Sequence, residues 1–224
     1  MIQSGTCKAV RVIAPKNENF DEEEGLGEEE SSVVIESVPF YTVAFFGILY
    51  ALGLALLIEK ATRSSEYFAF IPFFVGLAVI AIVDLRTTKI RNILVYPTLA
   101  ATVISLVITS GITGHWPYLL TAAGGGVILF AIYGVVWYAY PKGMGFGDVR
   151  MAGLIGVGVG WISLWSVAIV VFVASIAGLI VAIVAIAATG KGSRLRVPFG
   201  PALAIGGMVG VLWGPHFVNL WLHR

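Results

Sequence analysis

The chain has 224 residues and a formal net charge of +1, with 58% hydrophobic residues, only 12% charged residues and a mean hydropathy of +0.92. This composition excludes an ordinary water-soluble globule and predicts a polytopic membrane protein, and the absence of a basic face argues against nucleic acid as a partner. One cysteine, Cys7, and three histidines without ligand spacing argue against a bound metal, so no cofactor is expected.

Residues 1–38 are polar and acidic, unlike the rest of the chain. The block DEEEGLGEEESS at 21–32 combines like charges with glycine and serine, and it has too little apolar surface to repay the entropy of ordering. The first strongly apolar run begins near Pro39 and follows acids instead of a basic segment, which is not the pattern of a signal peptide. We expect residues 1–38 to form a disordered acidic tail.

Seven apolar runs follow, each close to the roughly 20 residues that a helix needs to cross a bilayer. They are expected at residues 39–58, 67–83, 92–110, 117–139, 149–162, 165–188 and 199–222. The predicted fold is therefore an all-α, polytopic integral membrane bundle of about seven transmembrane helices, in which the fifth and sixth divide between Gly160 and Trp165.

Small residues and tryptophans predict how these helices pack. Glycines recur at spacings that let helix backbones approach one another in lipid. They are Gly124, Gly125, Gly126, Gly153, Gly156, Gly160, Gly206, Gly207 and Gly210. The six tryptophans lie mostly near the ends of predicted helices, and we expect them to form an interfacial belt.

The basic residues of the short loops predict the orientation of the chain. Eight of them follow the second, fourth and sixth runs: Arg86, Lys89, Arg91, Lys142, Arg150, Lys191, Arg194 and Arg196. The opposite side has three, Lys60, Arg63 and Arg224. Because cytoplasmic loops carry the excess of lysine and arginine, the first set is expected in the cytosol, and the acidic tail with it.

Only two acidic residues follow Glu66, and both lie at the edge of an apolar run. Asp84 ends the second run, and Asp148 opens the fifth within the stretch PKGMGFGDVR at 141–150. A carboxylate beside the hydrocarbon phase is costly, so it is by default a functional hypothesis. Two complete crossings separate the aspartates, which places both at the cytosolic boundary, where they can form one site.

Two aspartates that share a proton cannot both be ionised, so one can act as general base and the other as general acid. Such a pair can hydrolyse an amide with water and without a metal. Gly143, Gly145 and Gly147 would allow a bent backbone and let another backbone approach Asp148. Because a helix N-terminus favours a carboxylate, Asp148 is expected to be the base and Asp84 the acid.

Other readings of the aspartates stay open at this point. Asp148 could serve only as the N-cap of the fifth helix, and Asp84 could pair with Arg86, Lys89 or Arg91. The two could instead relay protons or cations in a transporter, although transporter sites usually lie at mid-membrane. A purely structural membrane subunit would tolerate replacement of both.

The stretch VDLRTTKIRN at 83–92 resembles the first signature region of the prepilin peptidases. These GxGD-type membrane aspartic proteases remove leader peptides from type IV prepilins and related subunits. Asp84, Ile90 and Asn92 match the family pattern, and Arg91 stands where the family has proline.

The stretch GMGFGDVRMAGLIG at 143–156 resembles the second signature region. Gly145, Gly147, Asp148 and Val149 match, and Arg150 stands where lysine is usual. The segment VPFGPALAIGG at 197–207 is similar to the stretch before the family's last helix. The three segments occur in the family's order.

The resemblance implies that Asp84 and Asp148 are the catalytic pair, and that residues 39–224 form a transmembrane peptidase domain. The matching residues expected to bind substrate or shape the site are Gly145, Gly147, Asn92 and Arg150. The implied substrate is a pilin, pseudopilin or flagellin-like precursor, cut after a short basic leader at the cytosolic face of the cell membrane. Larger members carry paired cysteine motifs associated with N-methylation, so a chain with Cys7 alone is expected to be a peptidase-only form.

Overall fold

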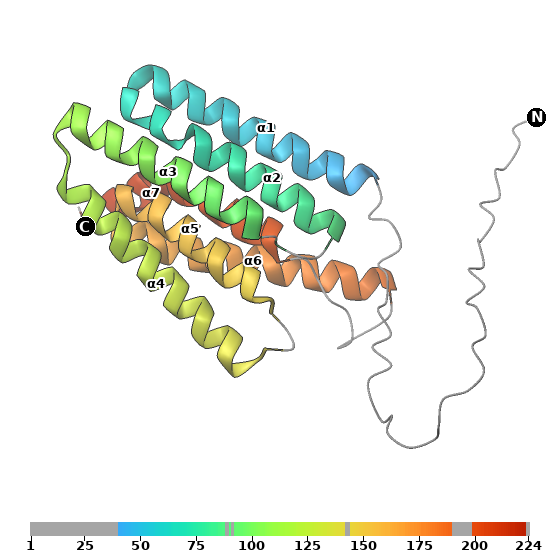
Figure 1. The fold of residues 1–224 in the computed structure, drawn as a ribbon. Helices are drawn as coiled ribbons and strands as arrows, with labels where there is room; N and C mark the ends of the chain where they lie inside the picture. The colour runs from blue at the N-terminus through green and yellow to red at the C-terminus, as the bar shows by residue number, and fades with distance from the viewer. Residues whose placement is uncertain (1–39, 88–89, 91, 142–143, 190–198, 223–224) are drawn as a thin grey trace, which may run out of the picture. The chain divides into compact units, whose positions relative to one another are not determined.

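Seven α-helices and one 3-10 helix form the part of the chain that the computed structural model describes, residues 40–87, 90, 92–141, 144–189 and 199–222 (Figure 1). They are α1 (Phe40–Arg63), η1 (Ser65–Phe70), α2 (Ile71–Thr87), α3 (Asn92–Thr113), α4 (Pro117–Ala139), α5 (Phe146–Ile162), α6 (Leu164–Thr189) and α7 (Gly200–Leu222). These residues contain no strand, so the all-α prediction is confirmed.

Five segments of the described residues are long and apolar enough to cross a membrane. They are Ala44–Arg63, Glu66–Thr87, Asn92–Thr113, Pro117–Ala139 and Leu164–Ile183. A multi-pass helical membrane bundle is thereby confirmed. With 17 residues α5 rises only about 25 Å, less than the ~30 Å hydrocarbon core, and the count of seven crossings stays a prediction.

Several helix boundaries differ from the predicted ones by three to five residues, including the two beside the aspartates. Helix α2 continues to Thr87, so Asp84 lies inside its last turn, and α5 begins at Phe146, so Asp148 lies inside its first turn. The hydropathy pattern places a helix boundary at the first charged residue, whereas the backbone hydrogen bonds of the helix continue past that residue. The division between the fifth and sixth helices falls at Ser163, within the predicted interval.

Helices α4 and α5 pack through glycines, as Figure 1 shows by their course side by side. A Cβ atom added to Gly156 would lie 2.2 Å from the carbonyl oxygen of Gly125, and one added to Gly160 would lie 2.6 Å from that of Thr121. No real side chain fits such distances. The predicted packing role of glycine is therefore confirmed at this contact.

One tryptophan contradicts the predicted interfacial belt. Trp161 is only 4% exposed, its ring meets those of Phe70 and Tyr118 edge to face, and its indole N–H donates to Ser110 Oγ at 3.2 Å. The tryptophan lies near a helix end, as expected, but it faces the bundle core. Hydropathy could not distinguish a position at the membrane interface from one in the bundle core, because both environments suit an indole ring with one polar atom.

Several predictions fall on residues outside the described part. They are the acidic tail at 1–38, with the domain boundary after it, and the loop residues Lys89, Arg91, Lys142, Gly143, Lys191, Arg194 and Arg196. The described helices all belong to one compact unit, Glu36–Arg224.

Candidate active site

Asp84 and Asp148 come together at one end of the bundle. The last turn of α2 carries Asp84, and the first turn of α5 carries Asp148. Their exposed fractions are 3% and 9%, and the charge of Asp84 acts directly on Asp148. The two carboxylates are therefore buried neighbours, as the even number of intervening crossings predicts.

Each aspartate accepts a hydrogen bond from the backbone of a glycine that begins a helix. The N–H of Gly200, the first residue of α7, donates to Asp84 Oδ2 at 2.9 Å. The N–H of Gly145 donates to Asp148 Oδ2 at 3.1 Å. Each of these bonds engages the Oδ2 atom of its carboxylate.

The geometry bears differently on the two structural alternatives, an N-cap role for Asp148 and a pairing of Asp84 with nearby basic residues. Gly145 is the N-cap of α5 and Asp148 is its third residue, so the expectation of Asp148 as N-cap is wrong, although its side chain does bond back to the cap. Arg86 is exposed at the end of α2, and the bond that Asp84 makes is to the buried backbone of Gly200. Pairing with Lys89 or Arg91 lies outside the described residues.

The helix argument for assigning base and acid is weaker in the structure than in the sequence, because a helix N-terminus also faces Asp84. Asp148 lies in the first turn of α5, where N–H groups favour a carboxylate. Asp84 faces the first turn of α7, which favours it in the same way. The expectation of Asp148 as the base therefore stays a prediction.

Gly147 is required by a close approach of another backbone, as expected, but that backbone belongs to this chain. A Cβ at Gly147 would lie 2.8 Å from the Cβ of Ile90 and 3.0 Å from its carbonyl oxygen. Ile90 comes from the connection between α2 and α3, so this contact joins the segments after Asp84 and before Asp148. Gly145 has φ −76° and ψ 146°, which any residue adopts, so the bend before α5 does not require its flexibility.

Arg150 and Asn92 lie beside the aspartates and bind each other. The guanidinium of Arg150 donates to Asn92 Oδ1 at the start of α3. It also lies 4.5 Å from the ring centre of Phe146 and 6.0 Å from that of Tyr96. This cluster joins α5 to α3, so two of the residues predicted to shape the site do meet.

Three further residues of the site have no individual signal in the sequence. Gly200 bonds to Asp84, and Phe199 precedes it at the cap of α7. Tyr133 of α4 is buried, lies 6.2 Å from the Phe199 ring and is within the electrostatic influence of Asp148. The resemblance of residues 197–207 to a family segment drew attention to the region that contains Phe199 and Gly200. The backbone donor and the buried tyrosine themselves can be identified only from the folded structure.

The arrangement suits hydrolysis by water between two carboxyl groups. No three His, Cys, Asp or Glu side chains among the described residues gather into a metal-binding group. The carboxylates come as a pair, which can hold and pass protons but offers few ligands for a cation.

A family model shows which family the chain belongs to. The model described as the type IV leader peptidase family matches residues 71–183, just over half of the chain. The chain belongs to the type IV leader peptidase family. The match runs from the start of α2 into α6 and includes both Asp84 and Asp148. Membership of a peptidase family gives the transporter alternative no support.

Curated relatives point the same way. The chain is 29% identical over 152 residues to the "Prepilin leader peptidase/N-methyltransferase" of Stutzerimonas stutzeri, covering 66% of this chain and 50% of the relative. It is 32% identical over 111 residues to the protein of that name from Xanthomonas campestris pv. campestris, covering 47% and 36%. A third, from Legionella pneumophila, is 32% identical over 79 residues, covering 35% and 26%. The chain thus spans between about a quarter and half the length of these relatives, and no solved structure matches it.

Proposed function

We propose that this chain is a membrane-embedded aspartic endopeptidase that removes the short basic leader from prepilin-like precursors. Asp84 and Asp148 are its catalytic pair, within a peptidase domain at residues 39–224. The observation that carries the proposal is the pair itself: two buried carboxylates from separate helices lie close enough for the charge of Asp84 to affect Asp148, in a chain of the leader peptidase family.

The pair can complete a hydrolytic cycle without another reactant. The ionised carboxylate takes a proton from water while the water oxygen bonds to the carbonyl carbon of the scissile amide, and the protonated carboxyl gives its proton to the carbonyl oxygen. In the second half, the first carboxyl protonates the leaving nitrogen as the C–N bond breaks. The other carboxylate takes a proton from the diol, and each group returns to its starting state.

Burial supports this role because it keeps the pair in a medium of low dielectric constant. Two like charges repel strongly there, so the doubly ionised state is disfavoured and one shared proton is retained. The hydrogen bonds from Gly145 and Gly200 fix one oxygen of each group. Substrate and water then meet a pair whose geometry is already set.

The site-shaping residues hold the segments on either side of the pair. Gly147 allows the connection after α2 to touch the start of α5, and the bond from Arg150 to Asn92 joins α5 to α3. We infer that these contacts orient the backbone beside which an extended leader peptide lies.

The direct test is leader removal by the full chain in proteoliposomes with a prepilin-like precursor, which has a short basic leader before a hydrophobic helix. Mass spectrometry of the precursor should show loss of the leader at one peptide bond. The control is the same chain carrying Asp148→Asn. An intact precursor with the native chain, under conditions where a known leader peptidase cuts it, would contradict the proposal.

We further propose that the chain lies in the cell membrane with the aspartate pair facing the cytosol. The support is the excess of basic residues in the loops at that end. Tyr140 follows α4 at the aspartate end, Trp116 precedes α4 at the other end, and both are exposed. In a Cys7→Ser background, an impermeant maleimide applied to intact spheroplasts should label W116C and spare Y140C. The reverse pattern would overturn the orientation.

A further inference from the structure

Gly200 links Asp84 to the start of α7. Its N–H donates to Asp84 Oδ2 at 2.9 Å in a buried hydrogen bond that spans 116 positions of the sequence. Phe199, directly before it, accepts the backbone N–H of Leu203 through its carbonyl oxygen at 3.1 Å. Asp84 therefore rests on the first turn of a helix far along the chain.

Phe199 holds this first turn in place. A Cβ at Gly178 of α6 would lie 2.3 Å from the Phe199 ring, so the ring packs directly on the backbone of α6. The Phe199 ring also packs near the ring of Tyr133 in α4, with the two ring centres 6.2 Å apart. Helices α6 and α4 thus fix the position of the Gly200 N–H.

Asp84 needs this support because its own helix disfavours a negative charge at that position. It lies in the last turn of α2, where unpaired carbonyl groups carry partial negative charge. The first turn of α7 presents N–H groups with partial positive charge instead. Asp148, by contrast, lies in the favourable first turn of its own helix.

The contact leaves no room for a side chain at position 200. A Cβ there would lie 2.6 Å from Oδ2, 3.0 Å from Cγ and 3.1 Å from Cβ of Asp84. At Gly145, which makes the corresponding bond to Asp148, a Cβ would come only within 3.4 Å of Oδ2. We propose that Gly200 is a positioning residue for Asp84 and that the start of α7 sets the geometry of the aspartate pair; this inference rests on the proposed function.

The activity test compares Gly200→Ala with Gly134→Ala in the full chain, acting on a prepilin-like precursor. The added methyl group at 200 displaces Asp84, so kcat should fall about a hundredfold, the cost of a misplacement near 1 Å, with little change in KM. Gly134 of α4 is the matched control, since its Cβ would make an ordinary contact of 3.8 Å with Val149. Wild-type kcat in Gly200→Ala would overturn the inference while leaving the proposed function intact.

A stability test does not depend on catalysis. Gly200→Ala should lower the thermal midpoint of the purified chain, and most of that loss should vanish in an Asp84→Ala background, because the carboxyl group that the methyl meets is gone. Equal losses in both backgrounds would overturn the inference. If Gly200→Ala yields no folded protein, the double variant should recover it, and failure to recover would count against the inference equally. These results hold even if the native chain cleaves no precursor.

Discussion

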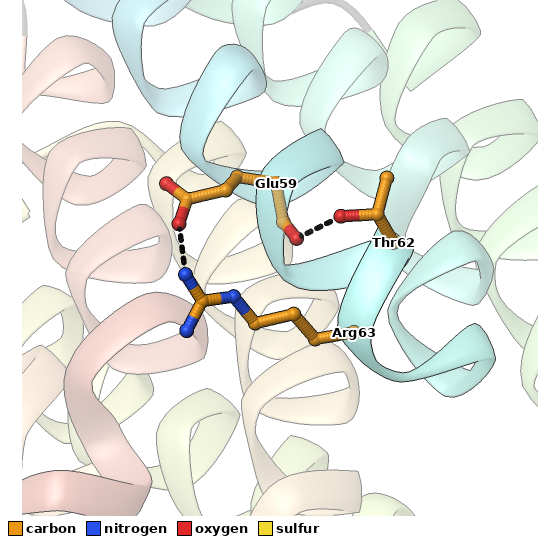
Figure 2. Close-up of polar contacts among 3 residues, drawn as sticks. All are labelled: Glu59, Thr62 and Arg63. Atoms are coloured by element: carbon orange, nitrogen blue, oxygen red, sulfur yellow. Dashed lines mark hydrogen bonds and ion pairs between the residues drawn. The ribbon is translucent and has the colours of Figure 1, made fainter.

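The two ends of the bundle treat their carboxylates in opposite ways. At the end where α1 finishes, Glu59 accepts a hydrogen bond from Arg63 Nη2 at 2.8 Å, and Figure 2 shows both side chains on the same side of the helix. At the same end Glu66 lies 3.1 Å from His115 Nδ1. At the other end, Asp84 and Asp148 are buried close to each other, and each accepts a hydrogen bond from a backbone N–H group.

This difference separates carboxylates that are paired at the surface from the two that we propose to be catalytic. An exposed acid beside a basic side chain loses little hydration, and the pair contributes little to the free energy of folding. Such pairs are common at membrane interfaces. Two buried acids placed together oppose folding, because each loses water and repels the other. A protein retains that arrangement where the pair has a task. The comparison predicts that substitutions at the two ends will have very different effects.

The largest difference is expected for acid-to-amide substitutions. Asp84→Asn and Asp148→Asn should each lower the rate of leader cleavage about 10²- to 10⁴-fold, the contribution of a general acid or base. The asparagine carbonyl can still accept the glycine N–H, so folding should persist. The matched variants Glu59→Gln and Glu66→Gln should stay within about twofold of the native rate. A comparable loss in the glutamine variants would remove the distinction between the two ends.

A smaller loss of cleavage is expected where the segment before Asp148 is disturbed. In Gly147→Ala the new methyl group lies 2.8 Å from Ile90 Cβ, so the start of α5 and the connection after α2 must separate. We expect cleavage to fall about tenfold, because a shift of less than 1 Å already affects a positioned group. The control is Gly47→Ala in α1, where a Cβ meets nothing within 4 Å. Native activity in Gly147→Ala would show that this contact does not set the site.

Stability alone should change at the glycine contact between α4 and α5. Gly156→Ala should lower the free energy of unfolding by about 1–3 kcal/mol, since overpacking forces the backbones apart. Gly124→Ala is the control on α4, because its Cβ would make an ordinary contact of 3.6 Å with Leu164. Thermal unfolding of the purified chain measures both. A neutral Gly156→Ala would mean that the helices are not held at the described separation.

The smallest effect belongs to the exposed pair at the end of α1. The side chains of Arg63 and Glu59 are 79% and 59% exposed, so a double-mutant cycle of Arg63→Met and Glu59→Gln should give a coupling free energy of about 0.3–0.5 kcal/mol. High salt should reduce it further. A coupling of several kcal/mol would place this pair in the same class as the buried aspartates.

Most of the helices were predictable because their apolar runs are close to the length of a membrane crossing. The pairing of Asp84 with Asp148 was predictable too, since two full crossings between them return the chain to the same side. Both inferences need only the hydropathy pattern and the length of a crossing.

The support of Asp84 was not predictable in the same way. The bond from Gly200 joins residues 116 positions apart, and a backbone N–H leaves no mark in the sequence. Trp161 shows a second limit of prediction from the sequence, because hydropathy does not distinguish a residue that faces lipid from one that faces the core. The argument for Asp148 as the base is weaker for a related reason, because a helix from elsewhere in the chain also presents its first turn to Asp84.

The most direct test of the central claim, that Asp84 and Asp148 act as one site, is the cleavage rate of the double variant Asp84→Asn/Asp148→Asn beside the two single variants. Groups that work as a unit are strongly non-additive, so the account predicts that the double variant cleaves no more slowly than the slower single variant. A double variant whose loss is the product of the two single losses, or a single variant that cleaves at the native rate, would contradict it.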